Sequence, residues 1–276
     1  MKHLNDYITE KLKINSNTKT HNYYPKDKKE LRKILQERLK EDNADLNDID
    51  VSEITDMSHL FSNIDLDNVD ISCWDVSNVT TMKSMFYDCE NFSCDLSKWN
   101  VSNVKDMTAM FENCNKFNSD LSKWDVSNVV TMYRMFESCT EFNSDLSKWN
   151  VSKVENMNKT FFGCEKFNSD LSKWNVSNVN DMCAIFANCV SFNSDLSNWD
   201  VSNVVCMQSM FNGATKFNCD LSKWDVSSAD TMFKMFNDCH KFNSDLSNWD
   251  VSNVTNMGDM FKNCKSLKNI PIWYNK

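Results

Sequence analysis

A tryptophan returns every 25 residues along most of this 276-residue chain, and neither an insertion nor a deletion interrupts the spacing. The eight positions are Trp74, Trp99, Trp124, Trp149, Trp174, Trp199, Trp224 and Trp249. A period this strict is typical of an array in which one structural unit stacks on copies of itself. We therefore expect long, regular surfaces on this protein rather than one deep pocket.

Each repeat combines two spacings of apolar residues. In the unit that begins at Trp99, Trp99 and Val101 alternate with polar residues, which is typical of a strand with one buried face. Between residues 104 and 114, apolar residues recur every three or four positions, which indicates a short helix with an apolar stripe. The sequence therefore predicts an α/β repeat solenoid, in which each coil has one short strand and one short helix.

Such coils expose apolar faces to their neighbours, so the two ends of the array need covers. The units that we predict are an N-terminal helical cap over 1–49, a degenerate first repeat over 50–73, seven repeats over 74–249, and a last repeat with a C-terminal cap over 250–276. In the first unit, Asp27-x-x-Glu30 is a capping-box pattern ahead of a helix predicted at 28–40. Apolar residues from Leu4 to Leu12 predict a weaker helix before it.

The chain has only three glycines and two prolines, so we expect Asn, Asp and Ser to form its bends. An aspartate recurs shortly before each predicted strand. We interpret these carboxylates as acceptors for backbone N–H groups in the return loop rather than as catalytic groups, because catalysis would need many equivalent sites. The residues are Asp95, Asp120, Asp145, Asp170, Asp195, Asp220 and Asp245.

Seven of the twelve cysteines follow the same 25-residue spacing, and Ala214 replaces a cysteine in this column. The replacement indicates a site for a small apolar group. We predict reduced core thiols rather than disulfides, because parallel side chains in a ladder are poorly oriented for the disulfide dihedral angle. The column contains Cys89, Cys114, Cys139, Cys164, Cys189, Cys239 and Cys264. The remaining cysteines, which we expect on the surface or in loops, are Cys73, Cys94, Cys183, Cys206 and Cys219.

Composition and motifs restrict the function. The net charge of −9 disfavours nucleic acid as a partner, because phosphate binding needs a basic surface. No catalytic motif occurs, and the cysteines and four histidines follow no metal-ligand spacing, so we expect neither an enzyme nor a metal or cofactor. The sequence also has no apolar run of membrane-spanning length and no apolar signal-peptide core. We therefore expect a cytoplasmic protein, located in the host cell if the chain is viral.

Two regular features suggest ligand binding, and each has a simpler interpretation. The tryptophans could stack on sugar rings, but their fixed place in the predicted strand favours a buried ladder. A row of lysines beside a column of Asp and Asn could bind a regular polymer, although interleaved opposite charges are also typical of a solvated face. The lysines that we retain as candidates for partner binding are Lys98, Lys123, Lys148, Lys173 and Lys223.

Variation between repeats is concentrated on the predicted helix, in the columns that contain Lys83 and Tyr87. Drift on an unconstrained surface explains this variation as well as partner recognition does. Large aromatic side chains nevertheless dominate the binding energy of protein interfaces. The aromatic residues in these columns are therefore candidate anchors for a partner, namely Tyr87, Tyr133, Phe162 and Phe233.

The segment Trp74–Phe92, W-D-V-S-N-V-T-T-M-K-S-M-F-Y-D-C-E-N-F, and its copies, each closed by D-L-S-K-W, resemble the BspA-like, DUF285 class of leucine-rich-repeat-like proteins. The resemblance covers roughly residues 50–265. It implies coils with one strand each and a leucine-rich-repeat-like twist. Similar proteins occur on bacterial surfaces as adhesins, and in protists and large DNA viruses with no assigned role.

We therefore predict a non-catalytic repeat scaffold for protein–protein interaction, whose protein partner or partners the sequence does not identify. The alternative is a surface adhesin that binds a host or matrix protein and is exported without a conventional signal peptide. We expect no nucleic-acid partner and no membrane insertion, and a monomer or a weak end-to-end dimer.

Overall fold

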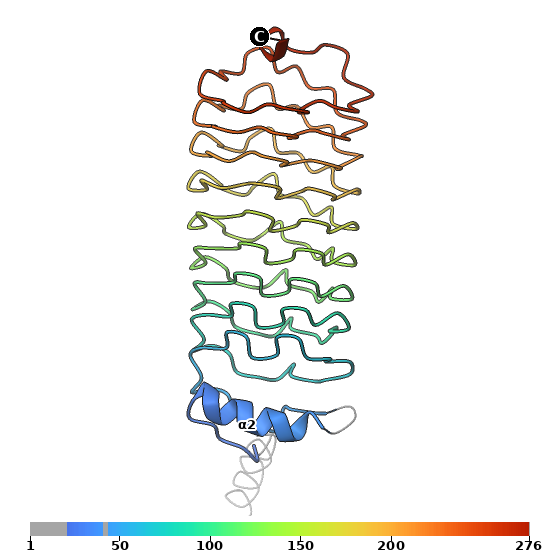
Figure 1. Cartoon of the computed structure of the whole chain (residues 1–276). Helices are drawn as coiled ribbons and strands as arrows, with labels where there is room; N and C mark the ends of the chain where they lie inside the picture. The colour runs from blue at the N-terminus through green and yellow to red at the C-terminus, as the bar shows by residue number, and fades with distance from the viewer. Residues whose placement is uncertain (1–20, 41–43, 276) are drawn as a thin grey trace, which may run out of the picture.

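The computed structural model describes residues 21–40 and 44–275, and it shows a stack of coils (Figure 1). Helix α2 spans Lys28–Arg38 at the N-terminal end of the stack, and a short 3-10 helix, η1, spans Ile272–Asn275 at the other end. No other helix is present in the described residues. The weaker helix predicted at Leu4–Leu12 lies outside them.

Helix α2 lies across the first coil, in the region where the sequence predicts a helix. Its N-cap is Asp27, whose Oδ1 accepts the N–H of Glu30 at 2.8 Å. Leu31 and Leu35 are buried, and both belong to the apolar core of the stack. The helix ends at Arg38, two residues before its predicted end.

The coils contain no strand–helix unit, so the prediction of an α/β repeat solenoid is wrong. Within residues 44–271 the chain forms no helix, and its β-structure consists of isolated parallel bridges. From Asp56 onward, one bridge joins each coil to the next, through Thr81 and Asp106 and so on to Asn256. From Asp56 onward, regular structure in the coils is therefore reduced to one column of single bridges.

The segment predicted as helical alternates between two kinds of hydrogen bond. The N–H groups of Met107, Ala109 and Phe111 donate to carbonyl oxygens of the next coil, at 3.2, 2.7 and 2.9 Å. Between them, the N–H groups of Met110 and Glu112 donate to carbonyl oxygens three residues back, at 3.2 and 3.3 Å. The chain thus makes successive tight turns while every second amide bonds to the neighbouring coil.

Two residues in each coil adopt the left-handed backbone conformation, which is incompatible with a helix. In the same repeat these are Ala109, with φ of 52°, and Asn113, with φ of 62°. The equivalent residues of the other coils also have positive φ, and only Gly163 and Gly213 among them are glycines. The apolar spacing of three or four residues therefore arises from consecutive turns, whose first and fourth residues both face inward.

The tryptophan column lies inside the stack, as its spacing predicts. The eight repeat tryptophans are only 3–4% exposed. Each indole N–H donates to a backbone carbonyl 28 residues earlier, as Trp124 does to Leu96 at 3.0 Å. Buried rings with satisfied N–H groups are core side chains, so these tryptophans do not offer a surface for stacking sugar rings.

Two columns of phenylalanine pack beside the indoles and join every coil to its neighbours. Within one coil, Phe111 stacks on Phe117 with ring centroids 4.0 Å apart. Between coils, Phe111 stacks on Phe136 at 5.5 Å. Because each ring has partners in the coils on both sides, the core is continuous along the stack.

The aspartates predicted to accept backbone N–H groups do so in every repeat. Asp120 Oδ1 accepts the N–H of Ser122 at 2.9 Å, and the other six close the same turn. Hydrogen bonds from Ser122 lower the pKa of the Asp120 carboxyl. Asn100 closes an equivalent turn by accepting from Ser102 at 3.2 Å. Asp and Asn therefore form the bends in a chain with few glycines.

The seven cysteines of the core column are free thiols, as predicted. Each sulfur donates to a backbone carbonyl 28 residues earlier, and Cys139 Sγ lies 2.9 Å from the Phe111 oxygen. Burial raises the pKa of the Cys139 thiol well above its ordinary value. The interpretation of this column as a site for a small apolar group is therefore incomplete, because the thiols also act as hydrogen-bond donors.

Candidate functional site

The bridges from Asp56 to Asn256 lie along one surface of the stack, which we call the ladder face. It consists of residues 81, 83, 84 and 87 together with their equivalents at 25-residue intervals. The two variable columns predicted to lie on a helix belong to this surface. The ladder face therefore carries side chains that change from coil to coil on a backbone that repeats.

All four aromatic residues predicted as anchors lie on the ladder face, where they are half-buried. Tyr87 and Tyr133 line one shallow depression of about 650 Å³, together with Arg134. Phe162 and Phe233 belong to the same surface but do not line this depression. The structure thus brings two of the four predicted anchors together.

Three of the four aromatic rings are in contact with a cation of the same coil. The pairs are Arg134 over Tyr133 at 5.1 Å, Lys159 over Phe162 at 5.2 Å, and Lys234 over Phe233 at 5.1 Å, each measured to the ring centroid. A cation–π contact at a partly exposed site contributes about 0.5–1 kcal/mol. These contacts restrict the rings to defined orientations on the surface.

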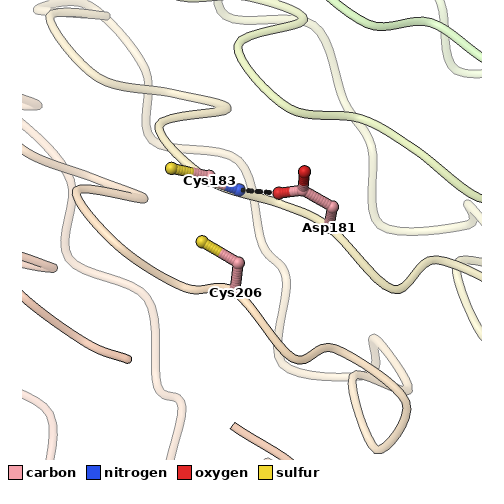
Figure 2. Close-up of side chains that lie close together, drawn as sticks. All are labelled: Asp181, Cys183 and Cys206. Atoms are coloured by element: carbon pink, nitrogen blue, oxygen red, sulfur yellow. Dashed lines mark hydrogen bonds between the residues drawn. The ribbon is translucent and has the colours of Figure 1, made fainter. Parts of the chain in front are cut away.

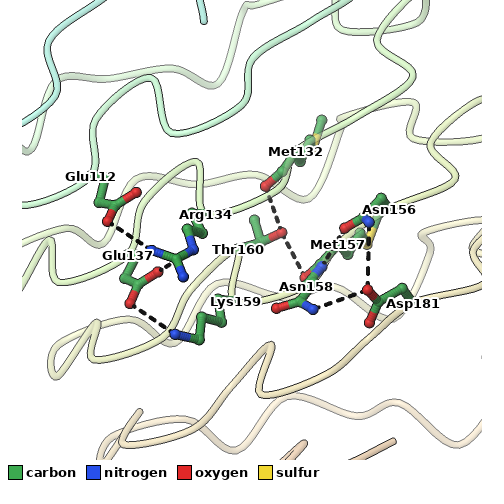
Figure 3. Close-up of polar contacts among 10 residues, drawn as sticks. All are labelled: Glu112, Met132, Arg134, Glu137, Asn156, Met157, Asn158, Lys159, Thr160 and Asp181. Carbon is green, nitrogen blue, oxygen red and sulfur yellow. Dashed lines mark hydrogen bonds and ion pairs between the residues drawn. The ribbon is translucent and has the colours of Figure 1, made fainter. Parts of the chain in front are cut away.

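Four charged side chains from three successive coils form an ion-pair network beside the depression (Figure 3). Arg134 lies 3.2 Å from Glu112 and 3.4 Å from Glu137, and Lys159 lies 3.5 Å from Glu137. The side chains of Glu112 and Glu137 are 9% and 12% exposed. Burial, together with the charge of Glu137, raises the pKa of the Glu112 carboxyl. The two cations therefore hold two largely buried carboxylates in place.

The five lysines predicted as alternative binding residues form a separate exposed row. Each lysine follows a turn-closing aspartate by three residues. Hydrogen bonds from Ser122, and to a smaller extent the charge of Lys123, lower the pKa of Asp120. Lys223 lines a shallow depression of about 420 Å³ with Asp195 and Asp220, and this depression shares no residue with the one beside Tyr133. Opposite charges thus alternate along this row.

One cluster on the ladder face was missed by reasoning from the sequence. Asp181, Cys183 and Cys206 each place one potential ligand atom within 4.8 Å of the other two, and all three residues are half-buried (Figure 2). Among residues 21–40 and 44–275, this is the one such group of three His, Cys, Asp or Glu side chains. The cysteines are 23 residues apart, so a search for short Cys-x-x-Cys spacing does not find them. Applying the 25-residue period to cysteines outside the core column would have placed them in adjacent coils.

The comparisons with known proteins agree with the repeat pattern. The family model described as "Mycoplasma protein of unknown function, DUF285" matches residues 29–144, 119–205 and 194–275. A search of curated proteins finds no match. In the part of the chain that the structure describes, no helix has the length and apolar character needed to cross a lipid bilayer.

Proposed function

This chain belongs to the DUF285 family, as its repeat motif indicates, and from its ladder face we propose that it is a non-catalytic scaffold that binds a protein partner. The observation that carries this proposal is the depression lined by Tyr87, Tyr133 and Arg134. Tyrosine and arginine are enriched among the residues that contribute most to binding energy in protein interfaces. The depression is shallow and open, which suits a protein surface better than a small molecule.

The rigidity of this surface supports the same function. The backbone beneath Tyr133 is bonded to both neighbouring coils, because its carbonyl accepts from Ala109 and Thr131 forms bridges on either side. The guanidinium of Arg134 is held by Glu112 and Glu137. Groups that are ordered before association lose less conformational entropy on binding, so more of the contact energy appears as affinity.

The charges in the network favour binding over catalysis. Glu112 and Glu137 are paired with Arg134 and Lys159, so their charges are compensated within the protein. A catalytic acid or base must instead exchange a proton with a substrate within hydrogen-bond reach. We therefore assign these residues a positioning role and propose no reaction for this surface.

The free thiols support a cytoplasmic location. All twelve cysteines are free, and such proteins are typical of reducing compartments. Protease treatment of intact native cells, followed by detection of the tagged protein, tests this location. We expect the protein to resist digestion until the cells are opened, and digestion on intact cells would instead favour the adhesin alternative.

The binding surface can be tested by recovering partners from the native organism with paired variants. Tyr133→Thr and Tyr87→Asn introduce residues that equivalent positions already contain, at Thr108 and Asn212, so the fold should tolerate both. We expect partners recovered by the wild-type chain to be lost with this double variant, because its principal anchors are absent.

A matched variant on the lysine row completes the experiment. Lys123→Ser, Lys148→Ser and Lys173→Ser together remove three exposed charges without changing the ladder face. We expect this triple variant to recover the same partners as the wild-type chain. Loss of partners with the lysine variant, but not with the tyrosine variant, would assign recognition to the lysine row and reject the proposal.

A further inference from the structure

We propose that Asp181, Cys183 and Cys206 form a binding site for Zn²⁺, held by two sulfur atoms and one carboxylate oxygen. The three side chains lie close together on the ladder face (Figure 2), and none of them lines the depression beside Tyr133. The site is therefore separate from the depression proposed to bind a partner, and its test does not depend on finding that partner.

The separation of the three ligand atoms suits this ion. The three atoms all lie within 4.8 Å of one another. In a tetrahedral zinc site, bonds of about 2.0–2.3 Å place neighbouring ligand atoms roughly 3.5–3.8 Å apart. The ligand atoms therefore need to approach one another by no more than roughly 1.3 Å to reach the spacing of a tetrahedral site.

The backbone holds the three residues in register. Asp181 and Cys206 form one of the parallel bridges between coils, and the N–H of Met182 donates to the Cys206 carbonyl at 3.1 Å. Within the first coil, the N–H of Cys183 donates to Asp181 Oδ1 at 3.0 Å. Two successive coils thus present their ligands on a frame that is formed before any ion binds.

The carboxylate is also oriented by the coil that precedes it. The side-chain amide of Asn158 donates to Asp181 Oδ2 at 2.9 Å, and that of Asn156 lies 3.5 Å from the same oxygen (Figure 3). Hydrogen-bond donors that contact a metal-binding carboxylate in this way fix its orientation and increase the affinity of the site for the metal. Asp181 therefore has the supporting contacts that a metal-binding carboxylate requires.

The fold does not require a thiol at either cysteine position. Threonine occupies the place of Cys206 in other coils, at Thr131 and Thr231, and forms the same bridge. Thr108 occupies the place of Cys183 three coils away in an equivalent turn. Polar residues therefore suffice for folding in both columns. The two thiols nevertheless occur in adjacent coils, next to an aspartate.

The site leaves one coordination position for solvent. Three protein ligands and an open fourth position are typical of zinc sites that retain a water molecule. Because all three residues are half-buried, an ion can reach them without any rearrangement of the core.

The test uses the full chain, reduced and freed of metal, and titrated with Co²⁺ as a spectroscopic substitute for Zn²⁺. We expect a thiolate-to-cobalt absorption band that saturates at one equivalent and disappears when Zn²⁺ is added. We also expect Zn²⁺ alone to raise the melting temperature of the protein, because an ion that binds only the folded state stabilises it.

Matched variants separate this site from the other thiols. Cys183→Thr and Cys206→Thr should fold like the wild-type chain without metal and should lose the saturable band. Asn158→Ala should weaken Co²⁺ binding by about 10–100-fold. Cys219→Ser is the control, because Cys219 Sγ accepts the Leu196 N–H as a serine does in other coils, and it should bind Co²⁺ unchanged.

Three results would overturn the proposal. The first is a wild-type chain without a saturable band, and the second is a band that persists in Cys183→Thr or Cys206→Thr. The third is a disulfide between Cys183 and Cys206 in protein whose thiols were blocked at cell lysis, since that bond would consume both sulfur ligands.

Discussion

The indole ring of Trp174 lies parallel to that of Trp149, with ring centroids 6.4 Å apart and an interplanar angle of 1°. Its N–H donates to the Leu146 carbonyl at 3.0 Å. We expect Trp174→Ala to lower the free energy of unfolding by about 3–5 kcal/mol, because it opens a cavity in the middle of the stack. Urea denaturation followed by circular dichroism measures this loss. The exposed neighbour provides the control, since Lys173→Ser should change stability by less than about 0.5 kcal/mol.

The left-handed residues predict a stabilising substitution. Ala184 has φ of 52°, a conformation that costs a residue with a side chain about 1–2 kcal/mol. Glycine relieves this cost but adds about 0.4–1 kcal/mol of unfolded-state entropy. We expect Ala184→Gly to raise the free energy of unfolding by roughly 0.5–1 kcal/mol, measured by urea denaturation.

Two further substitutions check the sign of this effect. Gly163→Ala is the opposite substitution, because it adds a side chain to a residue with φ of 72°. The added Cβ would meet no atom closer than 3.6 Å, so we expect backbone strain, rather than a clash, to destabilise the fold. Ala187→Gly, in the same coil as Ala184, replaces a fully buried residue outside the left-handed columns and should destabilise the protein. If Ala184→Gly and Ala187→Gly lowered stability equally, left-handed strain would not be significant here.

The ion-pair network predicts that replacing Arg134 alone destabilises the fold more than replacing Arg134 together with Glu112 and Glu137. Arg134→Ser leaves Glu112 and Glu137 close together without their shared cation. We expect a loss of roughly 1–3 kcal/mol, which is less than for a fully buried pair because Arg134 is one-third exposed. Adding Glu112→Asn and Glu137→Asn should restore stability to within about 1 kcal/mol of wild type, because other coils carry asparagine there. Denaturation curves of the wild-type chain, the single variant and the triple variant measure the difference.

The same variant should respond to acid in a defined direction. Burial and the charge of Glu137 raise the pKa of Glu112 even when Arg134 is present. A carboxyl whose pKa is higher in the folded state binds its proton more tightly there, so its effect on stability becomes favourable as the pH falls. The deficit of Arg134→Ser relative to wild type should therefore shrink between about pH 7 and about pH 4.5. A deficit that grows over this range would contradict the assignment.

Asp125, whose Oδ1 closes a turn by accepting the N–H of Ser127 at 3.0 Å, predicts the opposite pH dependence. Hydrogen bonds from Ser127 lower the pKa of Asp125, so its ionised form stabilises the fold above the unfolded pKa of about 3.9. This contribution is lost as the pH falls through the lower, folded pKa. Asp125→Asn keeps the turn, as Asn150 does by accepting from Ser152 at 3.1 Å, but it does not titrate. Its stability should fall less than that of wild type between about pH 5 and about pH 2 in urea titrations.

Features that depend on short-range contacts could be predicted from the sequence. The turn at Asp120 requires only Ser122, two residues away, and the start of α2 requires only Asp27 and Glu30. The inward position of the tryptophans follows from their unbroken period, because a large apolar side chain repeated on one face must be buried somewhere in the stack. For these features, the spacing of residues identifies the contact.

The conformation between residues 104 and 114 could not be predicted in the same way. Apolar residues three and four positions apart are compatible with a helix and with consecutive turns. The choice is made by partners in the next coil, such as the Tyr133 carbonyl, which accepts from Ala109 at 2.7 Å. A local pattern contains no information about an acceptor 24 residues away.

By itself, the sequence determined the period of the array, its buried aromatic columns and the aspartates that close its turns. Only the tertiary structure decided that Tyr87 and Tyr133 share a depression and that Asp181 and Cys206 lie side by side. The reason is the register between coils, which places residues about 25 positions apart against one another. That register is set by hydrogen bonds between coils, and these bonds exist only once the chain has stacked upon itself.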